Sequence, residues 1–356
     1  MAQKIIIDCD PGIDDALALA FAHGDPGLEV IGITTVAGNV GLAKTTANAL
    51  RVRDFIGMGD VPVVPGSPGP LLRQVLDARE VHGASGLNGA RLPDVASLPA
   101  AGHAVDYIID EISAAPGEIT LIAMGPLTNV AVAFRRHPAL ISQVKDFVIM
   151  GGSAGRGNVT AAAEFNMAAD PEAAAIAFSA GWTVTMVGLD VTLRTRATAA
   201  VRERMRGLGR LADDLLLPCL ASYGASQASA LVHAAPGDAG TGDAGLGDAG
   251  TAVECGRPGR LVAHAAEWEE RPGQDGAAVH DVCAVARVAR PGIVRCVPAR
   301  VQVETAGLLT AGMTVTDFTA ADSECNALVA IGIDVDGFWD LVIDGYARVA
   351  AGMAGS

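Results

Sequence analysis

The sequence is short of positive charge: 25 lysines and arginines face 40 aspartates and glutamates, a formal net charge of −15. This balance argues against a surface that follows the phosphates of a nucleic acid or an anionic membrane. No apolar run is long enough to span a bilayer and no signal peptide is evident, so we predict a cytoplasmic protein. The six cysteines lie far apart without a Cys-x-x-Cys pair, which favours reduced thiols over disulfides or a zinc site. Small uncharged substrates remain compatible with all of these absences.

Half of the 356 residues are apolar, enough for a large buried core. Strands are predicted at 5–7, 28–36, 61–64, 119–123, 144–150, 184–187 and 297–303, and helices at 16–22, 43–55, 105–114, 127–134, 171–180, 194–232, 277–288 and 338–349. This alternation predicts an α/β fold with an open, mostly parallel, Rossmann-like sheet and helices on both faces. We expect a single large domain over residues 1–356.

A cluster of carboxylates follows the first predicted strand. The strand leads through Asp8-Cys9-Asp10-Pro11-Gly12-Ile13-Asp14-Asp15 into a helix rich in alanine and leucine. Ligands of open α/β sheets bind at the carboxyl ends of strands, where this turn places its aspartates. Carboxylates this close repel one another unless a cation intervenes, and oxygen ligands suit Ca²⁺ or Mg²⁺. Any single aspartate could instead cap the helix or accept a hydrogen bond at the strand end, but this explains the whole cluster less well.

Polar residues recur in later loops of the chain, in the segments Thr35-Val36-Ala37-Gly38-Asn39, His82-Gly83-Ala84-Ser85-Gly86-Leu87, Ile122-Ala123-Met124-Gly125-Pro126-Leu127-Thr128-Asn129, Glu164-Phe165-Asn166 with Asn158 before it, and His280-Asp281-Val282-Cys283-Ala284. A carboxylate and an amide beside an aromatic residue suit the vicinal hydroxyls of a sugar. Singly, each segment has a simpler explanation: His82 could pack its own turn, Gly125-Pro126 could be a plain turn, and Asp170 could cap a helix that starts at Pro171. Only their combination indicates a site.

Together with the N-terminal run, these segments resemble the nucleoside hydrolases, specifically the inosine-uridine-preferring group, over nearly the whole chain. The resemblance implies a Ca²⁺ site made by Asp10, Asp15, Asp281 and the main-chain carbonyl of Met124. It implies that the substrate contacts are Asp14, Asn39, His82, Asn158, Glu164, Phe165 and Asn166. Val282 stands where the family usually has proline, a minor difference because proline is tolerated rather than required at a helix start. The implied partner is a small ribonucleoside, and the implied assembly is a homodimer or homotetramer.

The implied reaction is hydrolysis of the N-glycosidic bond, which releases free base and ribose in nucleoside salvage or catabolism. Its transition state resembles an oxocarbenium ion, so the enzyme needs an activated water, a strained ribose and help for the departing base. We predict that a calcium ion polarises the water and that Asp10 takes its proton as general base. His280 is predicted to protonate the leaving base as general acid.

Two alternatives remain open. Asp8-x-Asp10 is also similar to the haloacid dehalogenase-type phosphatases, which use an aspartyl nucleophile and Mg²⁺, although no matching downstream lysine can be placed. A non-catalytic nucleoside or ribose-binding protein would keep the sugar ligands and lose the base or the metal. Incubation with a nucleoside separates these classes, because only a nucleoside hydrolase releases base and ribose.

Residues 234–275 differ in character from the rest and are predicted to form a flexible insertion near the active site. Gly-Asp-Ala-Gly occurs three times, at 237, 242 and 247, and such small residues cannot bury a core. In the family this region carries residues that cover the nucleobase, so the preferred base is the least specified property. Tyr223 and Trp268 are the candidate base-stacking aromatics.

Replacement of residues 236–250 by a short Gly-Ser linker should leave the melting temperature nearly unchanged, because the segment is expected to contribute nothing to the core. The Michaelis constants for nucleosides can change, since the insertion is predicted to lie near the active site. Thermal unfolding and steady-state kinetics measure the two effects. A large fall in melting temperature would show that the segment belongs to the core.

Overall fold

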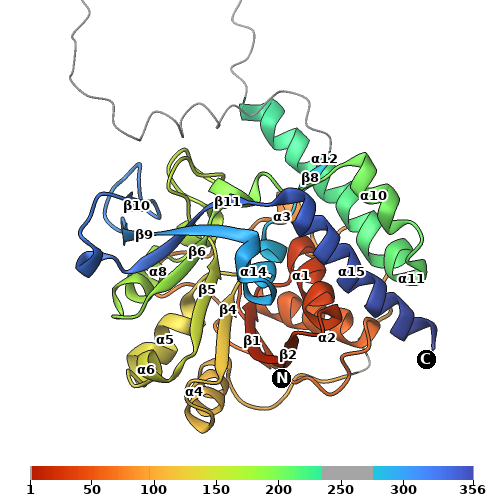
Figure 1. Cartoon of the computed structure of the whole chain (residues 1–356), viewed down its shortest axis with the longest axis horizontal. Helices are drawn as coiled ribbons and strands as arrows, with labels where there is room; N and C mark the ends of the chain where they lie inside the picture. The colour runs from red at the N-terminus through yellow and green to blue at the C-terminus, as the bar shows by residue number, and fades with distance from the viewer. Residues whose placement is uncertain (1, 96, 235–275, 356) are drawn as a thin grey trace, which may run out of the picture.

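The computed structural model describes residues 2–95, 97–234 and 276–355 (Figure 1). In this part of the chain, nine strands form one open sheet in the order β10-β9-β11-β6-β5-β4-β1-β2-β3. Their bounds are β1 (Gln3–Cys9), β2 (Leu28–Thr35), β3 (Val63–Pro65), β4 (Ile119–Ala123), β5 (Asp146–Met150), β6 (Val184–Val187), β9 (Val294–Val303), β10 (Thr314–Asp317) and β11 (Ala327–Ile333). The strands from β3 to β11 in this order pair in parallel, whereas β9 pairs antiparallel with β11 and β10. The predicted open, mostly parallel α/β sheet is confirmed.

Helices cover both faces of the sheet. The longer ones are α1 (Ile13–Gly24), α2 (Leu42–Phe55), α4 (Ala104–Ala114), α5 (Thr128–Arg136), α8 (Pro171–Ser179), α10 (Ala199–Met205), α12 (Leu217–Ala234), α14 (Asp281–Ala289) and α15 (Val335–Ala354). The shorter ones are α3 (Arg79–His82), α6 (Leu140–Gln143), α7 (Phe165–Ala169), α9 (Leu189–Thr192) and α11 (Gly209–Leu211), with a π-helix at Ala212–Leu216 and single 3₁₀ turns at Pro291–Ile293 and Asp322–Glu324.

Strand β1 explains why two hydrophobic cores form. Successive side chains of a strand point to opposite faces. Ile5 and Ile7 accordingly pack into the core shared with α1, α2, α12, α14 and α15, while Ile6 packs into the core shared with α4, α5 and α8. All three isoleucines are fully buried. A β-branched run without polar alternation is therefore what a central parallel strand requires.

The strand order reverses beside β1. The chain runs from β1 to β2 and β3 on one side, and then places β4, β5 and β6 on the other. The connections that leave β1 and β4 consequently diverge, which opens a crevice at the carboxyl ends of these neighbouring strands. Asp10 and Met124 directly follow the two strands at this crevice.

Several local predictions were wrong. The predicted helix at 277–288 starts only at Asp281, because Ala277–Ala278 forms strand β8, which pairs antiparallel with β7 (Arg196–Ala197). This pairing joins segments some eighty residues apart, so no local pattern reveals it. Strands β10 and β11 were not predicted. The predicted insertion at 234–275 lies outside the described residues except for Ala234, and so does Trp268.

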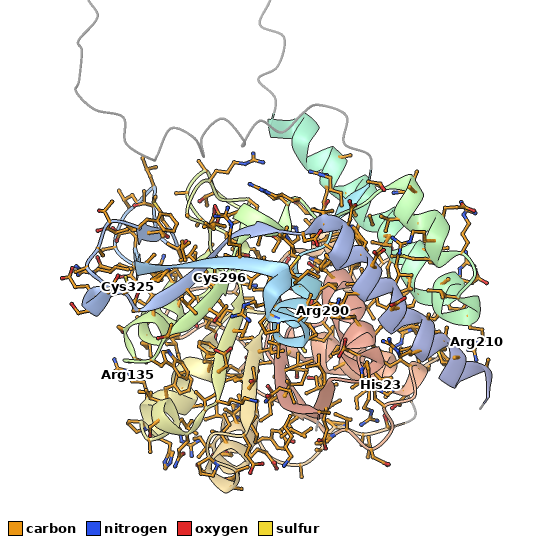
Figure 2. All side chains as sticks on the ribbon, in the orientation of Figure 1. His23, Arg135, Arg210, Arg290, Cys296 and Cys325 are labelled. Carbon is orange, nitrogen blue, oxygen red and sulfur yellow. The ribbon has the colours of Figure 1, made fainter. Side chains whose placement is uncertain are left out.

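The described cysteines are free thiols, as predicted: Cys9, Cys219 and Cys283 are buried, and Cys296 and Cys325 are partly exposed. The latter two lie apart from each other on the antiparallel side of the sheet (Figure 2). Among the helices that the structure describes, none combines the length and hydropathy needed to cross a membrane.

Candidate active site

Buried aspartates from two distant segments of the chain meet at the crevice. One carboxylate oxygen each of Asp14, Asp15 and Asp281 lies within 4.8 Å of the others, and all three residues are buried. Asp14 and Asp15 belong to the first turn of α1 and Asp281 to the first turn of α14. Asp10 adjoins this set, because its backbone N–H donates to Asp15 Oδ1 at 3.2 Å. The chain thus concentrates four carboxylates where the sequence predicted a cation.

Only one of the two carboxylate oxygens of Asp10 accepts a hydrogen bond from the described residues. Its Oδ2 accepts a hydrogen bond from the Asn39 N–H at 2.6 Å, while its Oδ1 is buried without a hydrogen-bond partner among the described residues. Two glycines pack against it so closely that a Cβ at Gly38 would lie 2.1 Å from Oδ2 and a Cβ at Gly125 would lie 2.6 Å from Oδ1. A buried carboxylate oxygen without a donor is costly unless a cation or a ligand proton reaches it.

Burial and mutual repulsion raise the pKa values of the cluster. Burial, followed by the charge of Asp14, raises the pKa of Asp15 to about 7. Burial and the charge of Asp15 raise the pKa of Asp10, and burial with the charges of Asp14 and Asp15 raises that of Asp281. A divalent cation would reverse these shifts, and a donor set made only of oxygens suits Ca²⁺ or Mg²⁺. The residues present therefore fit a hard divalent cation.

A cavity of about 120 Å³ opens beside the cluster. All seven predicted substrate contacts line it: Asp14, Asn39, His82, Asn158, Glu164, Phe165 and Asn166. The predicted Met124, His280 and Asp281 line it too, whereas Asp10 and Asp15 lie behind the wall. The structure thus brings together residues that the sequence scatters over more than 260 positions.

The sequence interpretation missed some of the lining residues, namely Ala78, Val81, Met150 and Val159, and it left Tyr223 without a position. Met150 ends β5 as Ala123 ends β4, so the rule that ligands gather at strand ends could have found it. The three small or aliphatic residues carry no chemical signal of their own.

Glu164, a predicted ribose contact, caps the short helix α7. Its side chain accepts hydrogen bonds from the N–H groups of Asn166 at 3.0 Å, Met167 at 3.3 Å and Gly152 at 2.9 Å. Burial nevertheless raises the pKa of Glu164 to about 7, because these donors only partly replace water. The position of the carboxylate is fixed by backbone donors and not by another charge.

The amide of Asn166 joins two strand ends. Its Nδ2 donates to the carbonyl oxygen of Met124 at 2.9 Å and to that of Met150 at 3.0 Å. The Met124 carbonyl, a predicted cation ligand, therefore already accepts one hydrogen bond from a predicted ribose contact. A carbonyl oxygen has two lone pairs, so it can take a second partner.

Aromatic rings form another part of the wall. The Tyr223 hydroxyl donates to Asp14 Oδ2 at 3.0 Å, and its ring lies 5.3 Å from that of His82 and 6.4 Å from that of His280. His82 Nδ1 accepts from the Ile13 N–H at 3.0 Å, and His280 Nδ1 shares a hydrogen bond of 2.8 Å with Thr192 Oγ1. Nε2 is then the ring nitrogen of each histidine that is left for a ligand.

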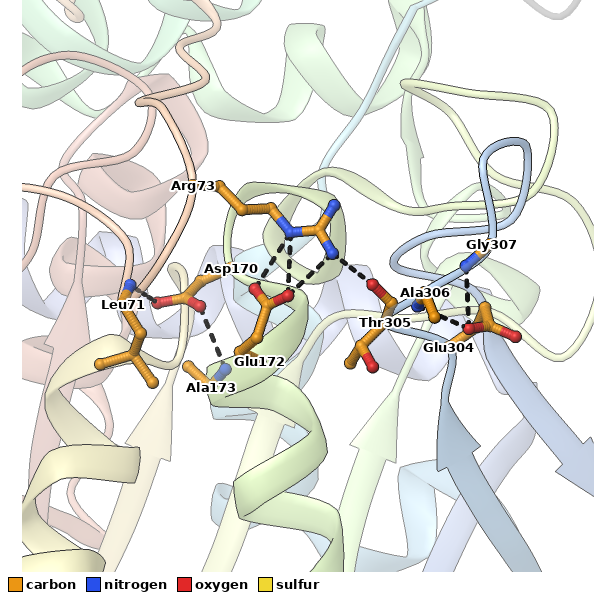
Figure 3. A network of polar contacts seen from close by, with 9 residues as sticks. All are labelled: Leu71, Arg73, Asp170, Glu172, Ala173, Glu304, Thr305, Ala306 and Gly307. Atoms are coloured by element: carbon orange, nitrogen blue, oxygen red, sulfur yellow. Dashed lines mark hydrogen bonds and ion pairs between the residues drawn. The ribbon is translucent and has the colours of Figure 1, made fainter.

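The loop that precedes His82 is anchored by a polar network (Figure 3). Arg73 makes a two-pronged contact with Glu172 and donates to the Thr305 carbonyl, while Asp170 accepts from the Leu71 N–H at 2.9 Å. Asp170 also accepts from the Ala173 N–H at 3.1 Å, so its predicted role as a helix cap is confirmed. The network ties the loop to α8 and to the hairpin before β10.

Asp8 is not placed to react. Its side chain is fully buried, its Oδ1 accepts from Thr34 Oγ1 at 2.6 Å and from Asn129 Nδ2 at 2.8 Å, and it does not line the cavity. The side chains that bind the Asp8 carboxylate, Thr34 and Asn129, do not line the cavity either, whereas Asn39, whose N–H donates to Asp10, does. The Asp8 side chain instead stabilises the end of β1 by binding Thr34 of β2 and Asn129 of α5.

A larger cleft, of about 770 Å³, lies between the C-terminal ends of α1, α2 and α15. His23 and Arg210 are among its lining residues (Figure 2). None of the clustered aspartates reaches it, so we place the reaction in the smaller cavity.

Comparison with known proteins agrees with this geometry. The family model described as inosine-uridine preferring nucleoside hydrolase matches residues 5–340. The chain is 40% identical over 352 residues to the inosine-uridine preferring nucleoside hydrolase of Leishmania major, covering 98% of this chain and 99% of that one. The chain belongs to the inosine-uridine preferring nucleoside hydrolase family. It is therefore a nucleoside N-ribohydrolase, an enzyme that acts on ribonucleosides.

Two further members of the nucleoside hydrolases are similar over their full lengths. The pyrimidine-specific ribonucleoside hydrolase RihA of Salmonella agona (strain SL483) is 37% identical over 345 residues, which are 97% of this chain and 98% of that one. The solved structure of the purine-preferring ribonucleoside hydrolase from Gardnerella vaginalis superposes with a TM-score of 0.80 at 29% identity, covering 98% of this chain and 99% of the other. The fold is shared, whereas the names differ in the preferred base.

The cluster predicts how stability depends on pH and on a cation. The pKa of Asp15 is about 7 in the folded protein, against about 4 for an unfolded carboxyl. Between these values the folded state binds more protons, so stability falls as pH rises. The melting temperature in a chelator should accordingly be lower at pH 7.5 than at pH 5, and added Ca²⁺ should raise it more at pH 7.5.

Differential scanning fluorimetry at the two pH values, with chelator and with Ca²⁺, measures both effects. The variant Asp281→Asn, which removes one charge from the cluster, should weaken both. If added Ca²⁺ left the melting temperature unchanged at both pH values, the result would contradict a cation site.

Proposed function

We propose that the protein hydrolyses the N-glycosidic bond of ribonucleosides in a calcium-dependent reaction with an inosine and uridine type preference, releasing free base and ribose. One observation carries the proposal: a cavity lined by carboxylate and amide groups that suit sugar hydroxyls opens directly beside a buried cluster of aspartates. The name of the Leishmania major relative supports the preferred bases.

Asp10, Asp15, Asp281 and the Met124 carbonyl would hold the cation, and Asp14 lies close enough to Asp15 and Asp281 to share in it. When bound, the cation supplies the positive charge that acidifies water and keeps the surrounding aspartates ionised. The Oδ1 of Asp10 has no hydrogen-bond partner among the described residues, so it would be the atom that accepts a proton from the attacking water. Asp10 is therefore the general base of the proposal.

Asp14, Asn39, Asn158, Glu164 and Asn166 would hold the ribose hydroxyls. The cavity of about 120 Å³ is small beside ligand sites of roughly 300–1,000 Å³, which supports a site that encloses the sugar and leaves the base nearer its mouth. Tyr223 and His82, whose rings adjoin, would flank the base. Hydrogen bonds to the enclosed sugar can be used to distort its ring toward the transition state.

His280 would assist the departing base. Burial lowers the pKa of His280, and the charge of Asp14 opposes this shift only in part. The ring is therefore protonated less often than free imidazole, but its protonated form is a stronger acid. Thr192 fixes the ring through Nδ1, which leaves Nε2 for the leaving group. His280 lines the cavity beside the proposed cation ligand Asp281, which supports this role.

The alternatives are less well supported. A phosphatase would need Asp8 as its nucleophile, whereas the Asp8 side chain binds Thr34 and Asn129, neither of which lines the cavity. A binding protein without catalysis would not need the aspartates that cluster at the cavity, which the chain retains. A cytoplasmic enzyme of nucleoside salvage or catabolism that assembles as a homodimer or homotetramer stays our prediction, and sedimentation of the purified protein tests the assembly.

Release of ribose and base from inosine, uridine, cytidine, adenosine and guanosine tests the function directly. Asp10→Asn should lower the turnover number by about 10²-fold or more, because it removes the general base and one cation ligand. Asp8→Asn is the matched control, since it changes a buried aspartate two positions away whose Oδ1 accepts hydrogen bonds from Thr34 and Asn129, outside the cavity lining. Full loss in Asp8→Asn together with hydrolysis of a phosphate ester would favour the phosphatase instead.

Leaving-group chemistry tests His280. A nitrophenyl group departs without protonation, whereas hypoxanthine needs a proton, and general acid catalysis contributes about 10²- to 10⁴-fold. His280→Ala should therefore cripple hydrolysis of inosine and largely spare nitrophenyl riboside. His82→Ala, which removes the other cavity histidine, should affect both substrates alike. Equal losses on both substrates in His280→Ala would assign His280 to binding.

A further inference from the structure

The turn after β5, residues 151–155, lies between the ribose cavity and two buried polar side chains that the proposed mechanism does not use. One is Asp190, in the short helix α9, which is 4% exposed. The other is Thr314, the first residue of β10, which is 2% exposed. Neither residue lines the cavity.

Both side chains bind the backbone of this turn. Asp190 Oδ2 accepts from the Ala154 N–H at 2.9 Å, and its Oδ1 lies 3.5 Å from Ser153 Oγ. Thr314 Oγ1 accepts from the Ser153 N–H at 2.8 Å and donates to the Ser153 carbonyl at 2.7 Å. Ser153 Oγ in turn accepts from the Gly155 N–H at 3.0 Å. The turn is therefore held by side chains on two separate elements.

The turn needs this support because its backbone is unusual. Gly152 has φ of +74°, and a Cβ there would lie 2.9 Å from Met186 Sδ and from Thr314 Cγ2. Helix α9 also approaches closely, since the Leu189 N–H donates to the Gly152 carbonyl at 3.0 Å. A turn that leaves the extended strand conformation at a glycine needs fixed neighbours to keep a single geometry.

The turn transmits its position to the cavity through one hydrogen bond. The Gly152 N–H donates to Glu164 Oε2 at 2.9 Å, next to the residue that Thr314 and Asp190 hold. We propose that Asp190, assisted by Thr314, is a positioning residue that sets the 151–155 turn and thereby aims the Glu164 carboxylate at the ribose. This inference rests on the proposed function, because it takes Glu164 to be a ribose contact.

The burial of Asp190 favours this role over a purely structural one. A carboxylate is expensive to bury, and a neutral side chain could fill the same space at lower cost. The hydrogen bonds that Asp190 accepts or approaches from other elements, at Ala154 and Ser153, go to this turn. The Asp190 carboxylate therefore fixes the backbone of the 151–155 turn, which precedes the proposed ribose contacts in the chain.

The test is a double-mutant cycle between Asp190→Ala and Glu164→Gln, with kcat/KM measured for inosine and for its 2′-, 3′- and 5′-deoxy analogues. Asp190→Ala should lower kcat/KM for inosine about tenfold, chiefly through a higher KM, because a charge-assisted contact is misaimed. The loss should largely vanish in the Glu164→Gln background, and on the analogue that lacks the hydroxyl which Glu164 contacts. Residues that act as one unit show such non-additivity.

Two controls separate positioning from general stability. Asp190→Asn keeps a carbonyl that can accept from the Ala154 N–H and should retain most of the activity. Asp25→Ala removes another buried aspartate that holds a turn, through the Gly27 N–H at 2.8 Å, and should leave kcat/KM unchanged. If Asp190→Ala does not fold, Thr314→Val removes the parallel anchor and takes its place in the cycle.

Equal losses in both Glu164 backgrounds and on every analogue would overturn the role of Asp190, and so would wild-type kinetics in Asp190→Ala. Both outcomes leave an active wild-type enzyme. Absence of base release by the wild-type protein from any nucleoside would instead remove the proposed function itself, and the ribose role of Glu164 with it.

Discussion

The repulsion among buried carboxylates at the end of β1 is the constraint on which the rest of the structure depends. Four aspartates share a space with little water, and burial together with their charges raises the pKa values of Asp10, Asp15 and Asp281. The fold offsets part of this cost with backbone donors. Asp15 accepts from the N–H groups of Asp10 and Gly12, and Asp10 accepts from that of Asn39. The N-terminal turns of α1 and α14 also meet here, and the positive end of a helix dipole favours negative charge.

The sequence predicts the fold well where the signal is local. Ile5, Ile6 and Ile7 form a run without polar alternation, and the structure buries them alternately in two cores. Alternating strands and helices then specify a parallel sheet, because a parallel pair needs a crossover connection. The prediction fails where pairing is distant, as between Arg196 and Ala278, or where a single run such as Ala327–Ile333 gives no sign of its partner.

For the candidate site, too, local sequence signals support good predictions, whereas contacts between distant segments could not be predicted. Every residue named as a substrate contact lines one cavity, and each lies in or beside a short segment by which the sequence resembles the nucleoside hydrolases. The sequence could not show that Asp14 stands with Asp15 and Asp281, or that the Tyr223 hydroxyl binds Asp14 from 209 positions away. Nor could it show that Asp190 binds the backbone of Ala154. These relations depend on how distant segments pack, and the residue types alone carry no sign of them.

The amide of Asn166 has a consequence for how the two halves of the site respond to each other. One Nδ2 bridges the carbonyls of Met124 and Met150, so the proposed cation ligand Met124 and the proposed ribose contact Asn166 share a hydrogen bond. Any displacement of this amide by a sugar hydroxyl changes the electron density and position of the Met124 oxygen, and any pull of a cation on that oxygen changes the amide. Because coupling between two ligands is reciprocal, the proposed function implies that occupancy of the cation site and affinity for the sugar would be thermodynamically linked through this one side chain.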